Sequence, residues 1–296
     1  KQQYVMLGVT GPNEYENNVN NNWYTNYIAR WCLMYTAEKV AWIKNNHPQI
    51  WEKHKAALHF DEAEITNWAA IFNNIYLPNN DSLGIYLQQD GYMDKEQILV
   101  KDLPATDRPL NQKWSWDRIL RSCFIKQADV LQGLYFFEED FDIETHERNF
   151  HFYEQRTVHE SSLSPCVHSI LAAKIGDKDK SYEMYLRTSR LDLDDYNNDT
   201  EDGLHITSMA GTWLSVVKGF GGMRIVGDCL SFKPFLPKHF TAIAFKVKFR
   251  EAVILCKITQ TGISITNYAK NAIKLLVFDQ ERVIEAQGTE AIAYAS

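Results

Sequence analysis

The sequence predicts a mainly α-helical unit followed by a small antiparallel β-sheet unit. Two observations lead to this prediction. Over residues 1–223 the apolar side chains recur at the three- and four-residue spacing of helices that bury one face. Over residues 224–296 the spacing changes to alternation, which is typical of half-buried strands. With 296 residues, 45% of them hydrophobic, the chain is long enough to form a sizeable buried core.

Six helices are expected in the first unit. The first is expected over residues 22–46, and it should end at His47-Pro48, because proline disfavours helical backbone in the residue before it. The other helices are expected over residues 61–76, 116–137, 165–175, 179–188 and 206–220. The loops between them are long and polar, and such loops on a rigid scaffold often carry functional residues.

Five strands are expected in the second unit. In the first, residues 240–250, the mainly apolar set Ile243, Phe245, Val247 and Phe249 alternates with a more polar set. The other strands are expected over residues 252–258, 262–267, 274–278 and 282–286, with turns at 260–262 and 279–281. Strands this close in sequence, joined by short turns, predict an antiparallel sheet.

Composition and charge exclude several classes of protein. The net charge of −7 and the lack of a Lys/Arg-rich run argue against a nucleic-acid partner. Five scattered cysteines without a CxxC pair predict neither a disulfide framework nor a zinc site, and they fit a reducing cytoplasm. No apolar run is long enough for a membrane span, and no signal peptide is visible. Because the first residues read like the interior of a domain, we expect a longer parent protein.

A turn near the start of the chain carries the first candidate catalytic residue, Glu14. Glycine and proline in the segment 8–16 predict a shaped turn just ahead of an aromatic helix. A carboxyl group held among Tyr15, Trp23 and Tyr24 would be partly desolvated, which raises its pKa toward that of a general acid. The alternative is a capping or salt-bridged loop residue. The Asn-rich tract that follows is predicted to be a hydrogen-bonded loop instead of a linker.

Lys126 and Gln127 form the second candidate. They fall in a predicted helix that Ile125, Ala128 and Leu131 make partly buried, so the lysine needs a partner. Such a pair can hold a sugar hydroxyl or a phosphate oxygen. The alternative is a lysine that extends to solvent beside a solvated glutamine.

Two predicted helix N-termini offer seats for an anion. Ser161 and Ser162 precede the helix at 165–175, and His205 precedes the helix at 206–220. Hydroxyl groups and unpaired N–H groups at a helix N-terminus favour anions. The alternatives are simple N-capping by the serines and a structural role for the histidine. Leu163 stands where an HExxH zinc site needs its second histidine, so that site is excluded.

Four segments together resemble one known family. They are VTGPNEYENNVNNNWYTNY from Val9, IKQADVLQGLYFF from Ile125, RTVHESSLSPCVHSILA from Arg156 and YNNDTEDGLHITSMAGTW from Tyr196. In order and spacing they are similar to glycoside hydrolase family 65, whose inverting disaccharide phosphorylases act on α-glucosides such as maltose, trehalose, kojibiose and nigerose. Asn13 and the Asn-rich tract resemble the branch that acts on maltose.

The resemblance implies a fold and a set of roles. Residues 1–223 would be the C-terminal part of an (α/α)6 catalytic barrel, and residues 224–296 a C-terminal β-sheet domain. A β-sandwich and the first half of the barrel would lie upstream. Glu14 corresponds to the general acid, Lys126 and Gln127 to substrate-binding residues, and the set Ser161, Ser162 and His205 to phosphate-binding residues. Homodimers are typical of the family.

The resemblance also implies a mechanism that uses a single carboxylic acid. An inverting hydrolase needs a second carboxylate to activate water, whereas inorganic phosphate is already a nucleophile. Maltose and phosphate would give β-D-glucose 1-phosphate and D-glucose, with phosphate as a co-substrate and no metal or organic cofactor. One alternative is an inverting hydrolase with Glu160 as its base, and another is a non-catalytic carbohydrate-binding module. The isolated chain is expected to be inactive, because half a barrel leaves apolar faces uncovered.

Overall fold

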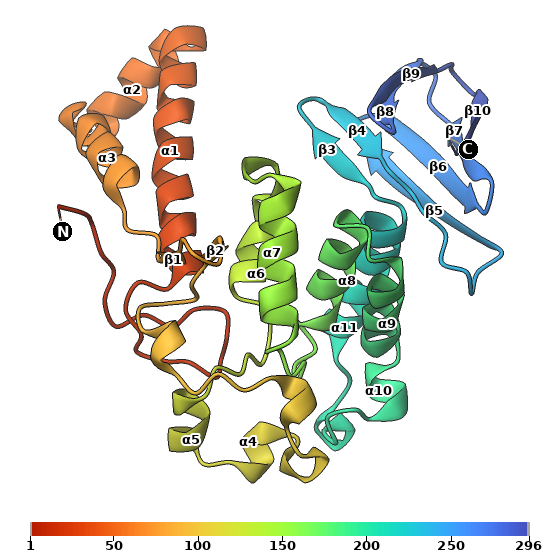
Figure 1. The fold of residues 1–296 in the computed structure, drawn as a ribbon. Helices are drawn as coiled ribbons and strands as arrows, with labels where there is room; N and C mark the ends of the chain where they lie inside the picture. The colour runs from red at the N-terminus through yellow and green to blue at the C-terminus, as the bar shows by residue number, and fades with distance from the viewer. Residues whose placement is uncertain (1, 295–296) are drawn as a thin grey trace. The chain divides into compact units, whose positions relative to one another are not determined.

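A computed structural model describes residues 2–294. Two compact units, divided between Val158 and His159, make up this part of the chain (Figure 1). Helices dominate up to Phe220, and the strands of two four-stranded sheets follow from Arg224 onward. The predicted fold class, helices followed by a β-sheet module, is therefore confirmed. The predicted domain boundary at residue 223 stays a prediction, because the two compact units divide at a different place, between Val158 and His159.

The first unit begins with three helices. α1 (Trp23–Asn46) starts where the Asn22 side chain accepts a hydrogen bond from the Thr25 N–H group. It ends at the predicted position, but α2 (Pro48–Leu58) follows at once, because proline is favourable in the first turn of a helix. α3 (Ala63–Asn74) then runs alongside α1 (Figure 1).

One predicted helix of this unit is wrong as a continuous element. Instead of residues 116–137, the structure has α5 (Trp116–Arg121), a loop, and α6 (Val130–Phe136). The loop backbone bonds to distant partners, because the Ile125 N–H group donates to Arg156 O at 3.0 Å and the Lys126 N–H group to Asn13 Oδ1 at 2.9 Å. Lys126 and Gln127 therefore lie in a bend and not on a helix.

Several further elements of the first unit, most of them short, were not predicted. α7 (Ile143–Glu154) is capped by Asp142, which accepts from the Thr145 N–H group at 2.7 Å. The others are β1 (Asn79–Asn80), β2 (Ile85–Tyr86), η1 (Tyr92–Asp94), η2 (Val100–Asp102), η3 (Ala105–Asp107), α4 (Leu110–Lys113) and η4 (Glu138–Asp140).

Aromatic side chains form much of the core of the first unit. The fully buried Trp23 ring stacks between Tyr27 at 4.9 Å and Tyr86 at 4.8 Å. α6 approaches it closely, since a Cβ at Gly133 would lie 2.5 Å from the Trp23 ring. These rings serve to pack α1 against α6, so they are not a surface for stacking sugars.

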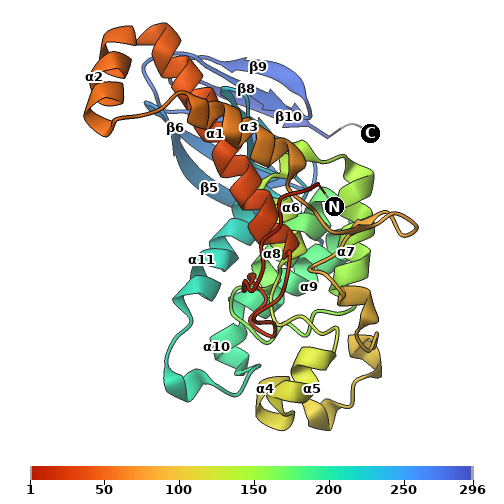
Figure 2. The same ribbon diagram turned by 90° about the vertical axis from the view of Figure 1, so that its left-hand side faces the viewer.

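The second unit continues with helices that pack side by side. α8 (Pro165–Lys174), α9 (Lys178–Ser189) and α11 (Ile206–Leu214) contact one another (Figure 2). The predicted helix at 206–220 is α-helical only to Leu214, and a π-helical turn, η6 (Ser215–Phe220), completes it. Two short elements, α10 (Leu191–Asp194) and η5 (Thr200–Asp202), precede α11.

Two sheets complete the second unit. Their orders are β10-β7-β6-β5 and β3-β4-β8-β9, and the pair β4–β8 is parallel, so the module is not purely antiparallel as predicted. Apolar faces of both sheets contribute to one buried cluster that includes Ile254, Ile265 and Leu275. The strands are β3 (Arg224–Val226), β4 (Cys229–Phe232), β5 (Ala242–Phe249), β6 (Ala252–Thr259), β7 (Gly262–Asn267), β8 (Ile273–Val277), β9 (Gln280–Ile284) and β10 (Thr289–Ala293).

Within residues 2–294, no helix combines the length and the apolar character that a membrane span requires.

Candidate active site

Residues 11–16, called the acid loop below, are held in place by the buried residue Asn13. Its N–H group donates to Asp129 Oδ2 at 3.1 Å, and its side-chain Nδ2 donates to Gln88 Oε1 at 3.2 Å. Its Oδ1 accepts from the N–H groups of Tyr15 at 3.2 Å and Lys126 at 2.9 Å. Because all polar groups of the Asn13 side chain are used, the backbone on both sides of Glu14 is fixed.

The Asn-rich tract after the acid loop is a hydrogen-bonded loop, as predicted. Asn21 Oδ1 accepts from the Met6 N–H group at 3.0 Å, and Asn21 Nδ2 donates to Asp90 at 2.7 Å. Val9 and Val19 exchange two backbone hydrogen bonds of 2.9 Å. The tract therefore closes the turn that carries Glu14 onto the start of α1.

Glu14 itself projects from this fixed loop, and its side chain is 57% exposed. Lys126 Nζ donates to Glu14 Oε2 at 2.6 Å. This hydrogen bond is the main reason that the pKa of Glu14 is lowered, with a smaller contribution from Gln127. The predicted rise in the pKa of Glu14 is therefore wrong for this structure. The reason is that Tyr15 and Trp23 point into the core and not around the carboxyl group.

Gln127 offers an unused acceptor beside this ion pair. The residue is only 3% exposed, and its Oε1 finds no hydrogen-bond donor among residues 2–294. A buried carbonyl oxygen without a donor is destabilising unless a ligand or water satisfies it. The structure thus brings Glu14, Lys126 and Gln127 together, with one carboxylate, one ammonium group and one amide available to a hydroxyl-rich ligand.

The two predicted anion seats of the second unit are linked to each other. Ser162 Oγ lies 2.7 Å from Thr207 Oγ1, which joins the segment before α8 to the first turn of α11. Ser161 Oγ accepts from the Leu163 N–H group at 3.2 Å. The N-terminal ends of two helices and several hydroxyl groups meet here, an arrangement whose electrostatics favour an anion.

His205 is held by carboxylates instead of facing open solvent. Its Nδ1 lies 2.6 Å from Asp192 Oδ1, and its Nε2 lies 3.5 Å from Asp199 Oδ2. The hydrogen bond to Asp192 is the main reason that the pKa of His205 is raised. The two carboxylates, Asp192 and Asp199, thus favour a protonated histidine. An anion could replace Asp199 as the partner of His205 Nε2, because that contact is the longer of the two.

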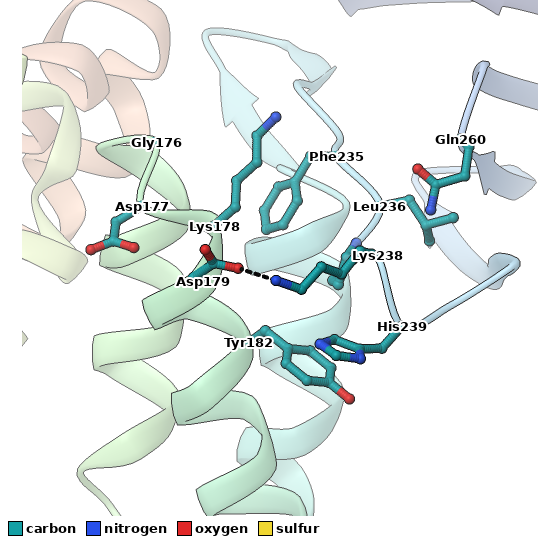
Figure 3. A pocket seen from close by; sticks show the side chains of 11 residues that line it. Gly176, Asp177, Lys178, Asp179, Tyr182, Phe235, Leu236, Lys238, His239 and Gln260 are labelled. Carbon is teal, nitrogen blue, oxygen red and sulfur yellow. Dashed lines mark hydrogen bonds and ion pairs between the residues drawn. The ribbon is translucent and has the colours of Figure 1, made fainter.

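A pocket of about 470 Å³ also lies in the second unit, at the turn between α8 and α9 (Figure 3). Asp179 pairs with Lys238 at 3.3 Å, and the Tyr182 ring stacks on His239 at 4.3 Å. Within the described part of the chain, its lining includes none of the predicted site residues. These polar and aromatic groups pair with one another, so the site predicted from the sequence stays the candidate active site.

Sequence reasoning missed two residues of these sites. Asp129 falls inside the helix predicted over residues 116–137, where its position suggests no role, and Thr207 follows His205 by two positions. Both become visible through partners far away in sequence, Asn13 for Asp129 and Ser162 for Thr207.

Comparison with known proteins identifies the family. Residues 1–214 match the central catalytic domain of glycosyl hydrolase family 65, and residues 223–284 match its C-terminal domain. The chain is 47% identical over 97% of its length to maltose phosphorylase of Bacillus subtilis strain 168, and 39% identical over 96% to α,α-trehalose phosphorylase of Thermoanaerobacter brockii. It spans about 37% of the length of each of these relatives.

A solved structure agrees with this assignment. A human-microbiome protein described as a kojibiose phosphorylase superposes with a TM-score of 0.90 at 32% sequence identity. The match covers 99% of this chain and 38% of the other. The chain therefore belongs to glycosyl hydrolase family 65.

Proposed function

We propose that this chain provides the general acid and the phosphate seat of an inverting disaccharide phosphorylase that acts on maltose. The observation that supports this most is the cluster of Glu14, Lys126 and Gln127 on a loop fixed by buried asparagines. The relatives named maltose and trehalose phosphorylase support the reaction class. The products would be β-D-glucose 1-phosphate and D-glucose.

In the proposed reaction Glu14 protonates the glycosidic oxygen. Without ligand, Lys126 keeps the pKa of Glu14 low. A sugar hydroxyl that takes over the hydrogen bonds of Lys126 and Gln127 removes this effect, and the sugar also excludes water from the carboxyl group. Both changes raise the pKa of Glu14, so the acid becomes protonated when substrate is bound.

Phosphate supplies the nucleophile. Bound by the hydroxyls of Ser161, Ser162 and Thr207 and by protonated His205, hydrogen phosphate attacks the anomeric carbon opposite the departing oxygen. The bond from carbon to the glycosidic oxygen breaks as the bond to phosphate oxygen forms. The leaving glucose takes the proton of Glu14, and the phosphate proton returns to solvent, from which Glu14 is protonated again.

An inverting hydrolase, with Glu160 as the base that activates water, is less well supported, because the relatives named above are phosphorylases. A non-catalytic sugar-binding module is also less well supported, because it gives no role to the carboxyl group of Glu14 and its lysine partner Lys126. Trehalose, kojibiose or nigerose as substrate remains the alternative within the family, and relatives acting on trehalose and kojibiose are 39% and 35% identical.

Further features of the proposal rest on the family resemblance. The active protein would contain upstream residues that complete the barrel and the glucose subsite, and it would be a cytoplasmic homodimer. Neither a metal nor an organic cofactor is part of the proposed reaction.

A disaccharide panel tests the proposal. The complete protein is incubated with maltose, trehalose, kojibiose or nigerose, with and without phosphate, and β-D-glucose 1-phosphate is measured. We expect this product from maltose, and only with phosphate. Sugar release that is unaffected by phosphate would indicate a hydrolase, and product from another disaccharide alone would correct the substrate.

A further inference from the structure

A buried carboxylate that the reaction itself does not use lies beneath the acid loop. Asp129 is 2% exposed and directly precedes α6, where an aspartate usually caps its own helix. Here its side chain makes no such cap among the described residues. Asp129 instead accepts from the Asn13 N–H group at 3.1 Å and from Asn22 Nδ2 at 3.0 Å and 3.1 Å.

These two partners hold different segments, Asn13 the acid loop and Asn22 the start of α1. Asn22 is the N-cap of α1, and its Oδ1 accepts from the Thr25 N–H group at 2.9 Å. Asn13 directly precedes Glu14 and holds the backbone of Lys126, the partner of Glu14, through a 2.9 Å hydrogen bond. One carboxylate therefore connects the start of α1, the acid and the lysine that controls the acid.

The acid loop also approaches this carboxylate very closely. A Cβ at Gly11 would lie 2.5 Å from Asp129 Oδ2 and 2.3 Å from Asn22 Nδ2. Real Cβ atoms essentially never come so close to other atoms. Glycine at position 11 is thus required for the loop to rest directly on the Asp129–Asn22 pair.

We propose that Asp129 is a positioning residue for the general acid: through Asn13 and Asn22 it fixes the acid loop so that Glu14 meets the glycosidic oxygen. This proposal rests on the proposed function of Glu14. Asp129 itself touches neither substrate nor phosphate. A small misplacement of a catalytic group is costly, because proton transfer requires the donor within hydrogen-bond reach.

The charge state of Asp129 fits a role that depends on geometry. Burial raises the pKa of Asp129 to about 7, and the neighbouring Glu16 adds to this rise. The Asn13 N–H group and the Asn22 side chain act in the opposite direction. Tyr24 of α1 and Tyr153 of α7 also face the carboxyl group, and their own pKa values are raised in part by it. Because a neutral carboxyl group keeps an acceptor oxygen, the loop does not depend on a permanent charge.

The test compares two substrates that differ in their need for an acid. Maltose requires a protonated leaving group, whereas α-D-glucosyl fluoride releases fluoride with the bonding electron pair and needs no proton. Asp129→Asn in the complete protein places an amide donor against the donors of Asn13 and Asn22. We expect kcat for phosphorolysis of maltose to fall about 10- to 100-fold, with a change of less than about 3-fold for the fluoride.

The matched control is the opposite substitution, asparagine to aspartate, at a buried position of the same unit that lies away from the acid loop. Asn149 on α7 is fully buried, accepts from the Tyr86 N–H group at 2.9 Å and donates to Thr145 O at 2.8 Å. Asn149→Asp should change both substrates by the same factor, because it perturbs packing away from the acid loop. Equal losses on both substrates for Asp129→Asn would mean a merely structural role and would overturn the proposal, as would no loss.

A milder variant covers the case in which Asp129→Asn does not fold. Asn22→Ser removes the donor to Asp129 and keeps a hydroxyl that can cap α1. It should show the same selective loss on maltose, smaller in size, and a loss shared by both substrates would contradict the proposal.

Glu14→Gln distinguishes a failure of the acid assignment of Glu14 from a failure of the positioning role of Asp129. If it impairs both substrates equally, the acid assignment itself fails; if it is selective and Asp129→Asn and Asn22→Ser are not, only the positioning role fails.

Discussion

Lys126 donates a hydrogen bond of 2.6 Å to the carboxylate of Glu14, although 112 residues separate the two in sequence. The contact lowers the pKa of Glu14, which keeps the proposed acid ionised before substrate binds. It depends on the bend before α6, where Asn13 holds the Lys126 backbone.

Removing the ammonium group should change how activity depends on pH. In Lys126→Met the pKa of Glu14 should return upward toward its ordinary range, so the protonated acid persists to higher pH. The basic limb of the kcat/KM profile for maltose should move to higher pH, while KM for maltose rises about 3- to 10-fold through the lost hydrogen bond. An unchanged basic limb would show that Lys126 does not control the acid.

The same pair should contribute little to folding stability. Because Lys126 lowers the pKa of Glu14, the stabilisation is present above the ordinary pKa of a glutamate and is lost as pH falls through the lowered value. The Glu14 side chain is 57% exposed, so solvent screens most of this effect. Lys126→Met should therefore leave the thermal midpoint of the complete protein at pH 7 nearly unchanged, and a large drop would contradict the exposed geometry.

Asp192 should tune phosphate binding through His205. Its hydrogen bond raises the pKa of His205, so the histidine stays protonated to higher pH and phosphate affinity falls only as pH rises through that raised value. Asp192→Asn should shift this loss to lower pH and raise KM for phosphate about 3- to 10-fold near pH 7. Asp194→Asn is the matched control, since Asp194 lies on the same α10 and pairs with Arg190 at 2.5 Å. Equal effects of the two variants would refute the claim that Asp192 tunes phosphate binding through His205.

The titration of Asp129 should make the folding stability of the protein depend on pH. Its pKa is about 7 in the fold against an ordinary 3.8, so its contribution is fully present below about pH 4 and is lost as pH rises through about 7. Asp129→Asn cannot titrate, so its thermal midpoint should vary less between pH 5 and pH 8 than that of the unaltered protein, by a few degrees at most. Asp117→Asn, at an exposed carboxylate of the same unit, should keep the original dependence. An identical dependence in Asp129→Asn would contradict the buried, titrating carboxyl group.

Sequence periodicity predicted the helices whose backbone bonds stay local. α1, α8 and α9 begin and end close to their predicted limits. The predicted helix at 116–137 failed because its backbone donors bind distant partners, such as the Lys126 N–H group on Asn13. Periodicity of side chains carries no signal for such a tertiary contact.

The turn that carries Glu14 was predictable from the sequence, whereas the electrostatics of Glu14 were not. Glycine and proline around Glu14 predicted a shaped turn, and the structure has one. The direction of the pKa shift depended instead on where Lys126 lies and on Tyr15 turning into the core. Asp129 was missed for a related reason, because the helix predicted over residues 116–137 contains it, and only the structure shows its carboxylate bound to Asn13 and Asn22.

The role of Glu14 as proton donor is tested most directly by Glu14→Gln in the complete protein, assayed with phosphate on maltose and on α-D-glucosyl fluoride. Glutamine keeps the size of the side chain but cannot donate the proton. We predict that kcat on maltose falls about 10²- to 10⁴-fold, while maltose still binds and the fluoride reaction is largely preserved. Substantial phosphorolysis of maltose by the variant, or an equal loss on both substrates, would contradict the assignment.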